Sequence, residues 1–455
     1  MDELVSINPA IGEELGRWPL MGLADIEATL AATARSAGQW SEVAVERRME
    51  VIRNTAGLLR ERTPQLAALI TEEMGKPLAE ARSEIGKCAL LCDYYAANAA
   101  GFLAPELIAT DASRSMARFL PLGIVLAIMP WNFPFWQVFR AAVPALAAGN
   151  AVLVKPAENV TGCSLAMERL FLEAGFPASL FSVLRVSVPI VSSIISDPRI
   201  AAVTFTGSQA AGAIVAAQSA GQVKKTVLEL GGSDPFIVLA DADVERSAEI
   251  AVLSRFGNCG QSCIAAKRFF ILSRVYDAWM DAFLHFVSKL KMGDPFMAET
   301  TLGPMARRDL RERLEDQVAR SVRMGCKVVI GGEQRHGGGW FFEPAVLTGC
   351  PPDSAVMEEE TFGPVAPVVA VPDERTAIQM ANSSLFGLGA SVWTEDQERG
   401  MQLSRQLHVG GVFINGMTHS DPRLPFGGVR QSGYGRELGR FGLLEFVNVQ
   451  TIWLA

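Results

Sequence analysis

The chain has 455 residues, of which 49% are hydrophobic and 20% are charged, and its formal net charge is −8. This length predicts two or three domains, and the composition is typical of a globular enzyme with substantial cores. The negative charge and the absence of clustered Lys or Arg argue against a nucleic acid or an anionic membrane as a partner. We therefore expect no nucleic-acid and no membrane partner.

Helical periodicity dominates from Ala24 to about Ala100, with amphipathic candidates at 47–59, 64–74 and 78–100. Short apolar or β-branched runs then alternate with helical patterns. The predicted strands are 124–129, 151–154, 202–205, 236–239, 268–272, 327–330, 366–370, 390–393 and 411–414. The predicted helices are 164–174, 210–220, 244–256, 275–290 and 306–324. This alternation predicts an α/β fold with mainly parallel sheets.

Two apolar stretches need separate interpretation. Phe119–Phe139 carries no charge over 21 residues, but its three prolines favour a buried strand followed by a Pro-rich loop over a membrane helix. The end of the chain, Leu443–Leu454, is strand-like and apolar. We expect this terminal strand to pair with another subunit.

The seven cysteines show no metal-ligand spacing and the four histidines are scattered, so we expect no metal site. Reduced thiols are typical of a cytosolic protein. The segment Met1–Val5 lacks the basic and apolar regions of a signal peptide. The expected location is therefore the cytoplasm.

The segment Phe256–Ala266 presents cysteines on a Gly-containing turn between a predicted helix and a predicted strand. This placement suits a catalytic thiol, but a buried structural cysteine would explain it as well. Cys259 lies four residues before Cys263, which raises the hypothesis of a regulatory disulfide. Such a bridge requires the two Cα atoms to lie close together.

Polar residues at the ends of other predicted strands could assist such a thiol. Glu229 ends an apolar strand before Gly231-Gly232, where burial would raise its pKa toward that of a general base. Asn132, in Pro-Trp-Asn-Phe-Pro, could donate an N–H to an oxyanion. Capping or ion pairing for Glu229, and a structural amide for Asn132, are the alternatives.

Phe205–Ser208 ends a strand and opens a helix, so its free backbone N–H groups could bind a phosphate. The sequence contains no GxGxxG motif. A dinucleotide would therefore bind in a non-standard way.

Seven motifs together resemble those of the aldehyde dehydrogenase superfamily, in order and across essentially the whole chain. They are Pro130–Pro134, Lys155–Glu158, Phe205–Ser208, Glu229–Gly232, Gly260–Cys263, Glu360–Pro364 and Pro425–Gly428. The resemblance implies a Rossmann-like NAD-binding domain and an α/β catalytic domain with a small β oligomerisation flap. The implied boundaries are 1–102 and 122–231 for the NAD-binding domain, 232–430 for the catalytic domain, and 103–121 and 431–455 for oligomerisation segments. A homodimer or homotetramer is expected.

The resemblance also implies roles for single residues. Cys263 matches the nucleophile that forms a thiohemiacetal and then a thioester, Asn132 the oxyanion donor, and Glu229 the base that activates water. The residues matching cofactor contacts are Trp131, Lys155, Glu158, Gly207, Ser208, Glu360 and Phe362. A carboxylate at Glu158 would accept a ribose hydroxyl and repel a 2′-phosphate, so we expect NAD, with NADP possible.

Trp136 and Arg140 lie four residues apart, on one face of a predicted helix. An arginine among apolar neighbours could bind an anionic substrate or form an internal ion pair with a distant acid. Together with Ser262 and Ser420, these residues resemble the substrate contacts of short bacterial succinate-semialdehyde dehydrogenases. The expected reaction is therefore NAD(P)-dependent oxidation of an aldehyde that carries a carboxylate, succinate semialdehyde, to succinate. A broad-specificity aldehyde dehydrogenase, a CoA-acylating semialdehyde dehydrogenase and a non-catalytic relative are the alternatives.

Overall fold

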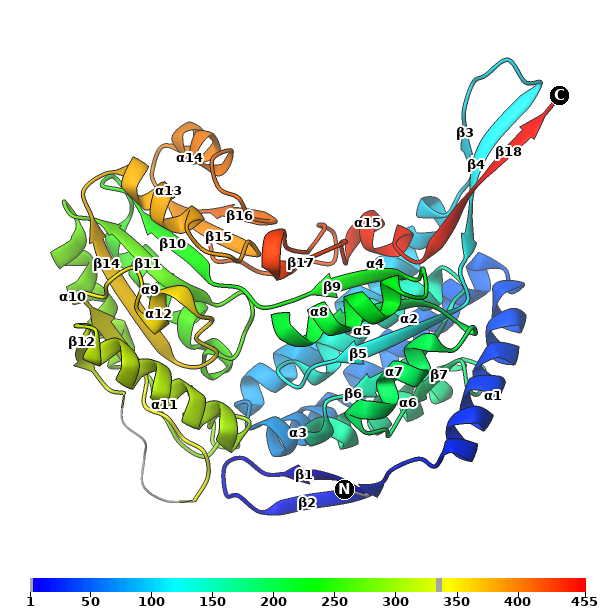
Figure 1. The fold of residues 1–455 in the computed structure, drawn as a ribbon, viewed down its shortest axis with the longest axis horizontal. Helices are drawn as coiled ribbons and strands as arrows, with labels where there is room; N and C mark the ends of the chain where they lie inside the picture. Colours follow the sequence, from blue (N-terminus) through cyan, green and yellow to red (C-terminus); the bar gives the residue numbers. More distant parts are fainter. Residues whose placement is uncertain (1–2, 333–337) are drawn as a thin grey trace.

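The computed structural model describes residues 3–332 and 338–455, which form two α/β lobes and a projecting arm (Figure 1). Met1 and Asp2, which open the N-terminal segment considered above, and His336 lie outside the described residues. A hairpin of β1 (Glu3–Ile7) and β2 (Glu14–Pro19) runs below the first lobe in Figure 1. The α/β fold class predicted from the alternation of elements is confirmed.

The first lobe is organised around a six-stranded sheet. Its strands are β5 (Ile124–Met129), β6 (Ala151–Pro156), β7 (Phe181–Val183), β8 (Ile200–Thr206), β9 (Lys225–Glu229) and β17 (Gly433–Tyr434). The order is β17-β9-β8-β5-β6-β7, and every pair except β17–β9 is parallel. The carboxyl ends of β5 and β9 point toward the second lobe, where parallel sheets place their ligand sites (Figure 1).

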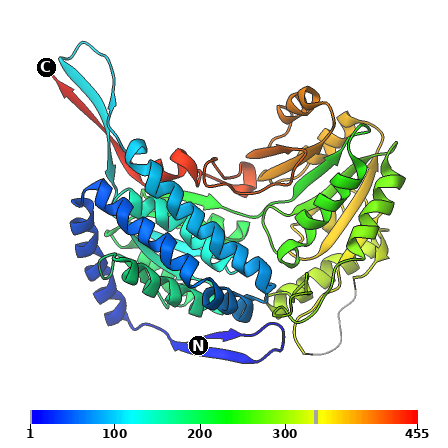
Figure 2. The same cartoon turned by 180° about the vertical axis from the view of Figure 1, so that it is seen from behind.

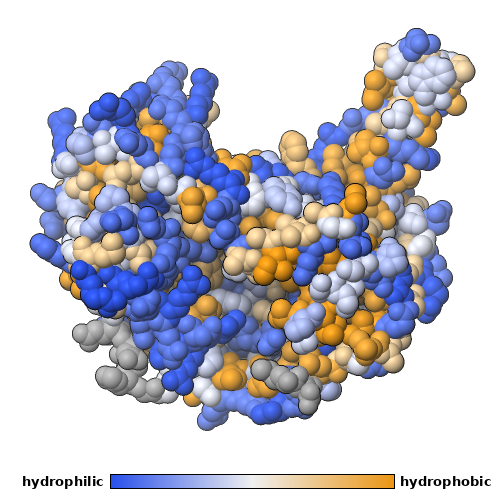
Figure 3. Space-filling model, in the orientation of Figure 1, coloured by the Kyte–Doolittle hydropathy of each residue, from blue (hydrophilic) through white to orange (hydrophobic). Residues whose placement is uncertain are grey.

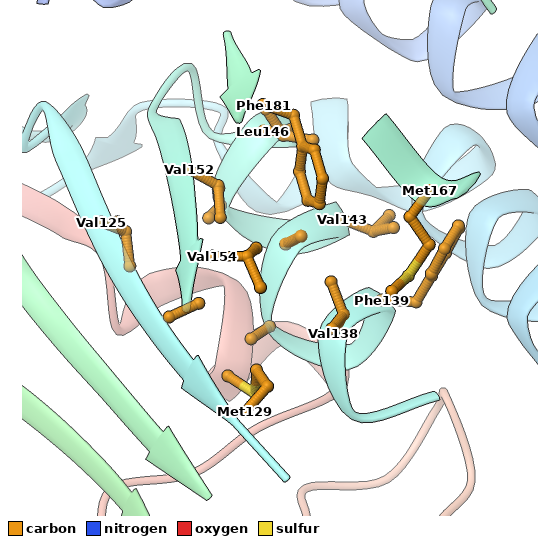
Figure 4. Packing of buried hydrophobic residues seen from close by; sticks show 14 of the residues in the cluster. Val125, Met129, Val138, Phe139, Val143, Leu146, Val152, Val154, Met167 and Phe181 are labelled. Atoms are coloured by element: carbon orange, nitrogen blue, oxygen red, sulfur yellow. The ribbon is translucent and has the colours of Figure 1, made fainter. Parts of the chain in front are cut away.

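Helices cover this sheet and bury its apolar side chains. They are α1 (Leu23–Ser41), α2 (Val45–Glu61), α3 (Thr63–Met74), α4 (Leu78–Phe102), α5 (Pro134–Ala147), α6 (Thr161–Ala174), α7 (Val188–Ser196), α8 (Gln209–Ala220) and α15 (Gly439–Leu444). Figure 2 shows α2 and α4 crossing the face that lies behind the sheet in Figure 1. Figure 4 shows Val138, Phe139 and Val143 of α5 lying among side chains of β5, β6 and α6.

The uncharged stretch Phe119–Phe139 forms the end of β4, then β5, a loop and the start of α5, so the predicted buried strand followed by a loop is present. All fourteen residues of α5 are buried, because the helix lies between the sheet and other helices. Across the described ranges, none of the helices combines the length and the apolar character needed to cross a membrane.

The second lobe contains a seven-stranded sheet. Its strands are β10 (Asp234–Val238), β11 (Ala266–Leu272), β12 (Lys327–Ile330), β13 (Ala345–Thr348), β14 (Val365–Val371), β15 (Gly389–Trp393) and β16 (Gly411–Ile414). The order is β12-β13-β14-β11-β10-β15-β16, with only β12–β13 antiparallel. Its helices are α9 (Val244–Phe256), α10 (Tyr276–Val287), α11 (Arg308–Arg323), α12 (Ala355–Glu358), α13 (Glu374–Asn382) and α14 (Gln397–Ser404).

The arm is a three-stranded antiparallel sheet that stands away from both lobes (Figures 1 and 3). It consists of β3 (Glu106–Leu107), β4 (Arg114–Pro121) and β18 (Val447–Leu454). The terminal strand was expected to pair with another subunit, but β18 forms its ladder with β4 of the same chain. Intrachain pairing satisfies one edge of β18, while its other edge has no strand neighbour within the described chain.

Candidate active site

The loop that carries Cys263 begins where α9 ends, and its backbone has an uncommon conformation. Asn258, Cys259 and Gly260 have φ values of 53°, 55° and 68°, in the left-handed region. Each non-glycine residue costs about 1–2 kcal/mol there because its Cβ approaches a carbonyl oxygen. Surrounding contacts must therefore hold this loop, which comprises residues 257–266 and is called the Cys263 loop below.

Three buried groups supply those contacts. Glu80 of α4 accepts a hydrogen bond from the backbone N–H of Asn258 at 2.8 Å. The Asn258 side chain donates to the carbonyl oxygen of Asn132 at 2.8 Å. Arg255 of α9 donates to the carbonyl of Gly260 at 2.9 Å and to that of Thr361 at 3.2 Å. The loop is thus joined to the first lobe and to the neighbouring segment that follows Glu360.

Cys263 is partly exposed, and its surroundings shift the pKa of its thiol in opposite directions. Burial of the thiol raises its pKa to about 11, whereas the nearby cations Arg140 and Lys267 lower it. Lys267 also donates to the carbonyl oxygens of Ser262 and Cys263, at 2.9 and 2.7 Å. The thiol is therefore protonated at neutral pH, and Lys267 both positions it and favours its ionised form.

Asn132 lies in the loop after β5, beside the Cys263 loop. Its side-chain Nδ2 donates to the carbonyl oxygen of Gln261 at 3.0 Å, so the amide has the structural role that was considered as an alternative. A primary amide has two N–H groups, and this contact uses one of them. The second N–H can still serve an oxyanion, and Asn132 lines the same cavity as Cys263.

Glu229 ends β9 with only 2% of its surface exposed, and neither carboxylate oxygen has a hydrogen-bond partner within the described chain. Burial raises its pKa well above the usual range, and the nearby Glu437 carboxylate raises it further. The contacts of Glu229 therefore do not support the alternative roles of capping or ion pairing. An unpaired, buried carboxyl group beside a thiol can act as a proton acceptor.

Gly231 and Gly232 allow Glu360 to approach this end of the sheet. A Cβ on Gly231 would lie 2.2 Å from a Glu360 carboxylate oxygen, and one on Gly232 would lie 2.7 Å from the Cys263 carbonyl oxygen. The N–H of Gly232 donates to Glu360 at 3.0 Å, and Lys267 forms an ion pair with Glu360 at 3.3 Å. The backbone contact requires glycine at position 232, and a side chain at position 231 would displace the Glu360 carboxylate.

A cavity of about 450 Å³ between the lobes brings many of the predicted residues together. Those that line it are Trp131, Asn132, Gly207, Ser208, Glu229, Cys263, Glu360 and Phe362. The rings of Trp131 and Phe362 meet edge to face there, with centroids 5.7 Å apart. The predicted residues Lys155, Glu158, Trp136, Arg140, Ser262 and Ser420 do not line this cavity.

The cavity continues to a site suited to a phosphate. Ser208 caps the N-terminus of α8 and accepts from Ala211 N–H at 3.4 Å, and the buried hydroxyl of Thr206 has no partner within the described chain. Lys155 is the penultimate residue of β6, which is separated from β8 by β5, and Glu158 lies in the short turn that follows β6. Burial lowers the pKa of Lys155 while Glu158 raises it. An unpaired hydroxyl and a helix N-terminus, with a lysine and a carboxylate at the end of another strand of the same sheet, fit a dinucleotide.

Two of the residues predicted to bind the substrate, Trp136 and Ser420, contact each other outside the residues that line the cavity. Trp136 Nε1 donates to Ser420 Oγ at 3.1 Å. Arg140 is 2% exposed, forms an ion pair with the buried Glu437 and lies 4.7 Å from the Phe426 ring centroid. The internal ion pair considered as the alternative for Arg140 is therefore present, and its role in substrate binding stays a prediction.

Several residues of this region were not identified from the sequence. Lys87, on α4, donates to Ser420 Oγ at 2.6 Å, and Glu437 pairs with Arg140. Both contacts join positions far apart in the chain, and Lys87 falls within an ordinary amphipathic pattern. Arg255 and Lys267 are cations among apolar neighbours in the sequence, and this pattern indicates that each has a buried hydrogen-bond or ion-pair partner.

The hypothesised bridge between Cys259 and Cys263 has little support in their surroundings. Both are free thiols. Cys259 is 2% exposed and packs in the core of the second lobe, whereas Cys263 packs against the core of the first. Burial raises the pKa of the Cys259 thiol, which disfavours the thiolate needed for disulfide formation.

A reactive thiol, a buried carboxyl group and a free amide N–H converge on one cavity, beside a helix N-terminus suited to a dinucleotide phosphate. Together with two α/β lobes, these features define the class of cofactor-dependent oxidoreductases that bind a carbonyl covalently. The sequence matches the aldehyde dehydrogenase family over residues 2–452, and the chain belongs to that family.

Relatives with known names resemble the chain over almost all of its length. Succinate semialdehyde dehydrogenase [NAD(P)+] Sad of Escherichia coli K12 is 46% identical, covering 99% of this chain and 97% of the relative. A probable succinate-semialdehyde dehydrogenase [NADP(+)] of Synechocystis sp. is 45% identical, covering 99% and 100%. The crystal structure of succinic semialdehyde dehydrogenase from Streptococcus pyogenes with NADP+ has a TM-score of 0.97 at 34% identity, covering 99% of each chain.

Proposed function

We propose that the protein oxidises succinate semialdehyde to succinate with NAD(P). The observation that carries the proposal is the convergence of Cys263, Glu229 and Asn132 on one cavity beside the α8 N-terminus. The names of the similar proteins support the substrate, and a cluster of cationic and hydrogen-bonding side chains around Trp136 and Ser420 suits its carboxylate. The proposed location is the cytoplasm, in line with seven free thiols.

In the proposed mechanism, the sulfur of Cys263 attacks the aldehyde carbon and forms a thiohemiacetal. Its proton passes to a base, for which Glu229 is suited by its raised pKa. The free N–H of Asn132 and the backbone N–H of Cys263 stabilise the oxyanion. The bound cofactor supplies the hydride acceptor. After Glu229 has released the thiol proton to solvent, it removes a proton from the water that hydrolyses the thioester.

The residues present fit the cofactor. Lys155 and Glu158 are proposed to hold the adenosine ribose, Gly207 and Ser208 the pyrophosphate, and Glu360 the nicotinamide ribose. Trp131 and Phe362 are proposed to lie beside the nicotinamide, where their rings line the cavity. The carboxylate of Glu158 favours a ribose hydroxyl over a 2′-phosphate because like charges repel, so NAD is preferred to NADP.

A substrate panel run with NAD and with NADP tests this function. We expect kcat/KM for succinate semialdehyde to exceed that for butanal at least tenfold, with glutarate semialdehyde between them. Equal values for succinate semialdehyde and butanal would contradict the preference for an acid. Adding CoA should leave succinate as the product, because Glu229 is present to activate water; formation of succinyl-CoA would indicate the acylating alternative.

The assembly is proposed to be a homodimer or homotetramer formed through the arm. Side chains of the arm remain exposed there, including Leu107 at 71%, Val449 at 59% and Trp453 at 54% (Figure 3). Exposed apolar groups on a projecting sheet favour burial against a second copy. The first lobe is proposed to bind the cofactor, and the second lobe is proposed to present Cys263. Residues 433–434 pair with β9 and thus also contribute to the first lobe.

A further inference from the structure

Lys87 on α4 lies directly against the residues proposed to contact the substrate. Its ammonium group donates to Ser420 Oγ at 2.6 Å and lies 4.2 Å from the centre of the Trp136 ring. Trp136 Nε1 donates to the same oxygen at 3.1 Å. Two N–H donors therefore converge on one neutral hydroxyl oxygen, and the hydroxyl proton of Ser420 must point elsewhere.

The two cations near Ser420 and Trp136 are Arg140 and Lys87, and they differ in whether an acidic side chain pairs with them. Arg140 already has a carboxyl partner, Glu437, and both side chains are almost fully buried. Lys87 has no ion pair within the described chain, although acids lie close to it. Glu84 is bound to Lys76, and Asp421 is bound to Arg423 at 2.6 Å.

The position of Lys87 relative to Trp136 is held by Glu84, which joins α4 to α5. Glu84, one turn earlier on α4, accepts hydrogen bonds from the N–H groups of Phe135 and Trp136, at 2.9 and 3.0 Å. This carboxylate caps the N-terminus of α5 and joins it to α4. Lys87 and Trp136 are therefore held at a constant separation.

We propose that Lys87 binds the carboxylate of the substrate, together with the hydroxyl of Ser420 and the indole N–H of Trp136. This inference rests on the proposed function and makes it more specific. The charge of Arg140 is offset by its ion pair with Glu437. Lys87 supplies the uncompensated positive charge, and a carboxylate oxygen can accept from the donors that now share the Ser420 oxygen.

The charge of Lys87 also depends on pH in a testable range. Burial and the nearby Arg140 lower the pKa of Lys87, to about 8, although Cys88, Glu84 and Asp421 partly oppose this shift. The ammonium form predominates at pH 7 and is lost as the pH rises through 8. Preference for an acid over a neutral aldehyde should fall over the same interval.

Three variants test the proposal in the full-length enzyme. Lys87→Met should raise KM for succinate semialdehyde and lower its kcat/KM by about 10- to 100-fold, the usual effect of a lost charged hydrogen bond. The kcat/KM for butanal should change less than threefold. Lys87→Arg should restore at least part of the preference. Arg82→Gln is the matched control, because Arg82 is an exposed cation on the same helix.

Succinate, used as an inhibitor competing with butanal, gives an independent readout. Its Ki should rise in Lys87→Met by a factor similar to the rise in KM, and in the wild type it should rise as the pH passes 8. Parallel losses for both aldehydes would overturn the proposal and indicate a structural role. If Lys87→Met fails to fold, Ser420→Ala should raise the Ki of succinate by a larger factor than it changes kcat/KM for butanal, and unchanged inhibition would overturn the proposal.

Different results would contradict the proposed function and the proposed role of Lys87. If the wild type shows no preference for succinate semialdehyde over butanal, the proposed function is wrong and Lys87 has no carboxylate to bind. If the wild type has the preference and Lys87→Met keeps it, only the role of Lys87 is wrong.

Discussion

Glu229 combines burial with an absence of hydrogen bonds, and this has a consequence for stability. The folded protein raises the pKa of Glu229 above its ordinary value of 4.5, so the unfolded chain releases this proton at lower pH. The group therefore destabilises the fold as the pH rises above about 4.5, and the penalty grows until the folded-state pKa is reached. We expect Glu229→Gln to raise Tm at pH 7.5 by a few degrees and to have little effect near pH 4.

The comparison must be made by thermal unfolding of both proteins across this pH range. A variant that is less stable than the wild type at pH 7.5 would contradict the argument. The same variant should lose at least 99% of its turnover, because general-base catalysis typically contributes a factor of about 10²–10⁴.

Lys267 affects Cys263 through charge and through position. Its ammonium group lowers the pKa of the Cys263 thiol and holds the Cys263 carbonyl. Lys267→Met should therefore shift the alkaline rise in thiol reactivity to higher pH. The rate of alkylation by iodoacetamide, followed between pH 6 and 10, measures this shift. An unchanged profile would mean that the lysine acts only as a structural hydrogen-bond donor.

Single residues of the site differ in how far they could be recognised from the sequence. Cys263, Glu229 and Asn132 each follow an apolar run that ends at a turn, and their motifs resemble a known family. Lys87 could not be recognised, because its partner Ser420 is 333 positions away. Likewise, the pairing of Arg140 with Glu437 depends on a chain crossing that no local pattern reveals.

Among the elements, the Cys263 loop depends on the lack of a side chain at Gly260. Gly260 has φ 68°, and a Cβ there would lie 2.4 Å from the carbonyl oxygen of Gly363. We expect Gly260→Ala to cost at least ~1–2 kcal/mol of stability and to displace Cys263, lowering kcat. Gly257→Ala is the control for stability, since no atom lies within 4 Å of its Cβ position.

Chemical denaturation and steady-state kinetics of both variants check this prediction. Equal stabilities for Gly260→Ala and Gly257→Ala would show that the loop relaxes without cost.

Periodicity predicted long helices and fully apolar strands well, and short or β-branched elements less well. The predicted strand 124–129 and the predicted helix 244–256 coincide with β5 and α9. The four-residue strand β13 is too short to show a period. Helix α7 has the sequence Val-Pro-Ile-Val-Ser-Ser-Ile-Ile-Ser, whose β-branched residues favour a strand locally, so packing decides its conformation.

At the scale of the whole molecule, the arm leaves apolar surface without cover. Trp453 is 54% exposed on β18, the outermost strand of the arm. If this strand meets a second copy, Trp453→Glu should shift the protein toward a smaller assembly, because it places a charge in an apolar contact. Light scattering coupled to size exclusion measures the mass. The exposed Leu172→Glu, on α6 of the body, should leave the mass unchanged.

The two-lobed α/β organisation could be predicted from the alternation of strands and helices, whereas the arm could not be placed from the sequence alone. Strands β4 and β18 are far apart in the sequence, and only the folded chain brings them into one ladder.

Arg255 joins two segments that are far apart in the chain. Its guanidinium group donates to carbonyl oxygens of Gly260, Thr361, Gly363 and Ala266. Four peptide groups from two segments thus depend on one fully buried cation. Those segments carry Cys263 and Glu360, so thermal fluctuations that release one also release the other. Deuterium uptake at both segments should then rise together, and an inactive population could accumulate on warming well before either lobe melts.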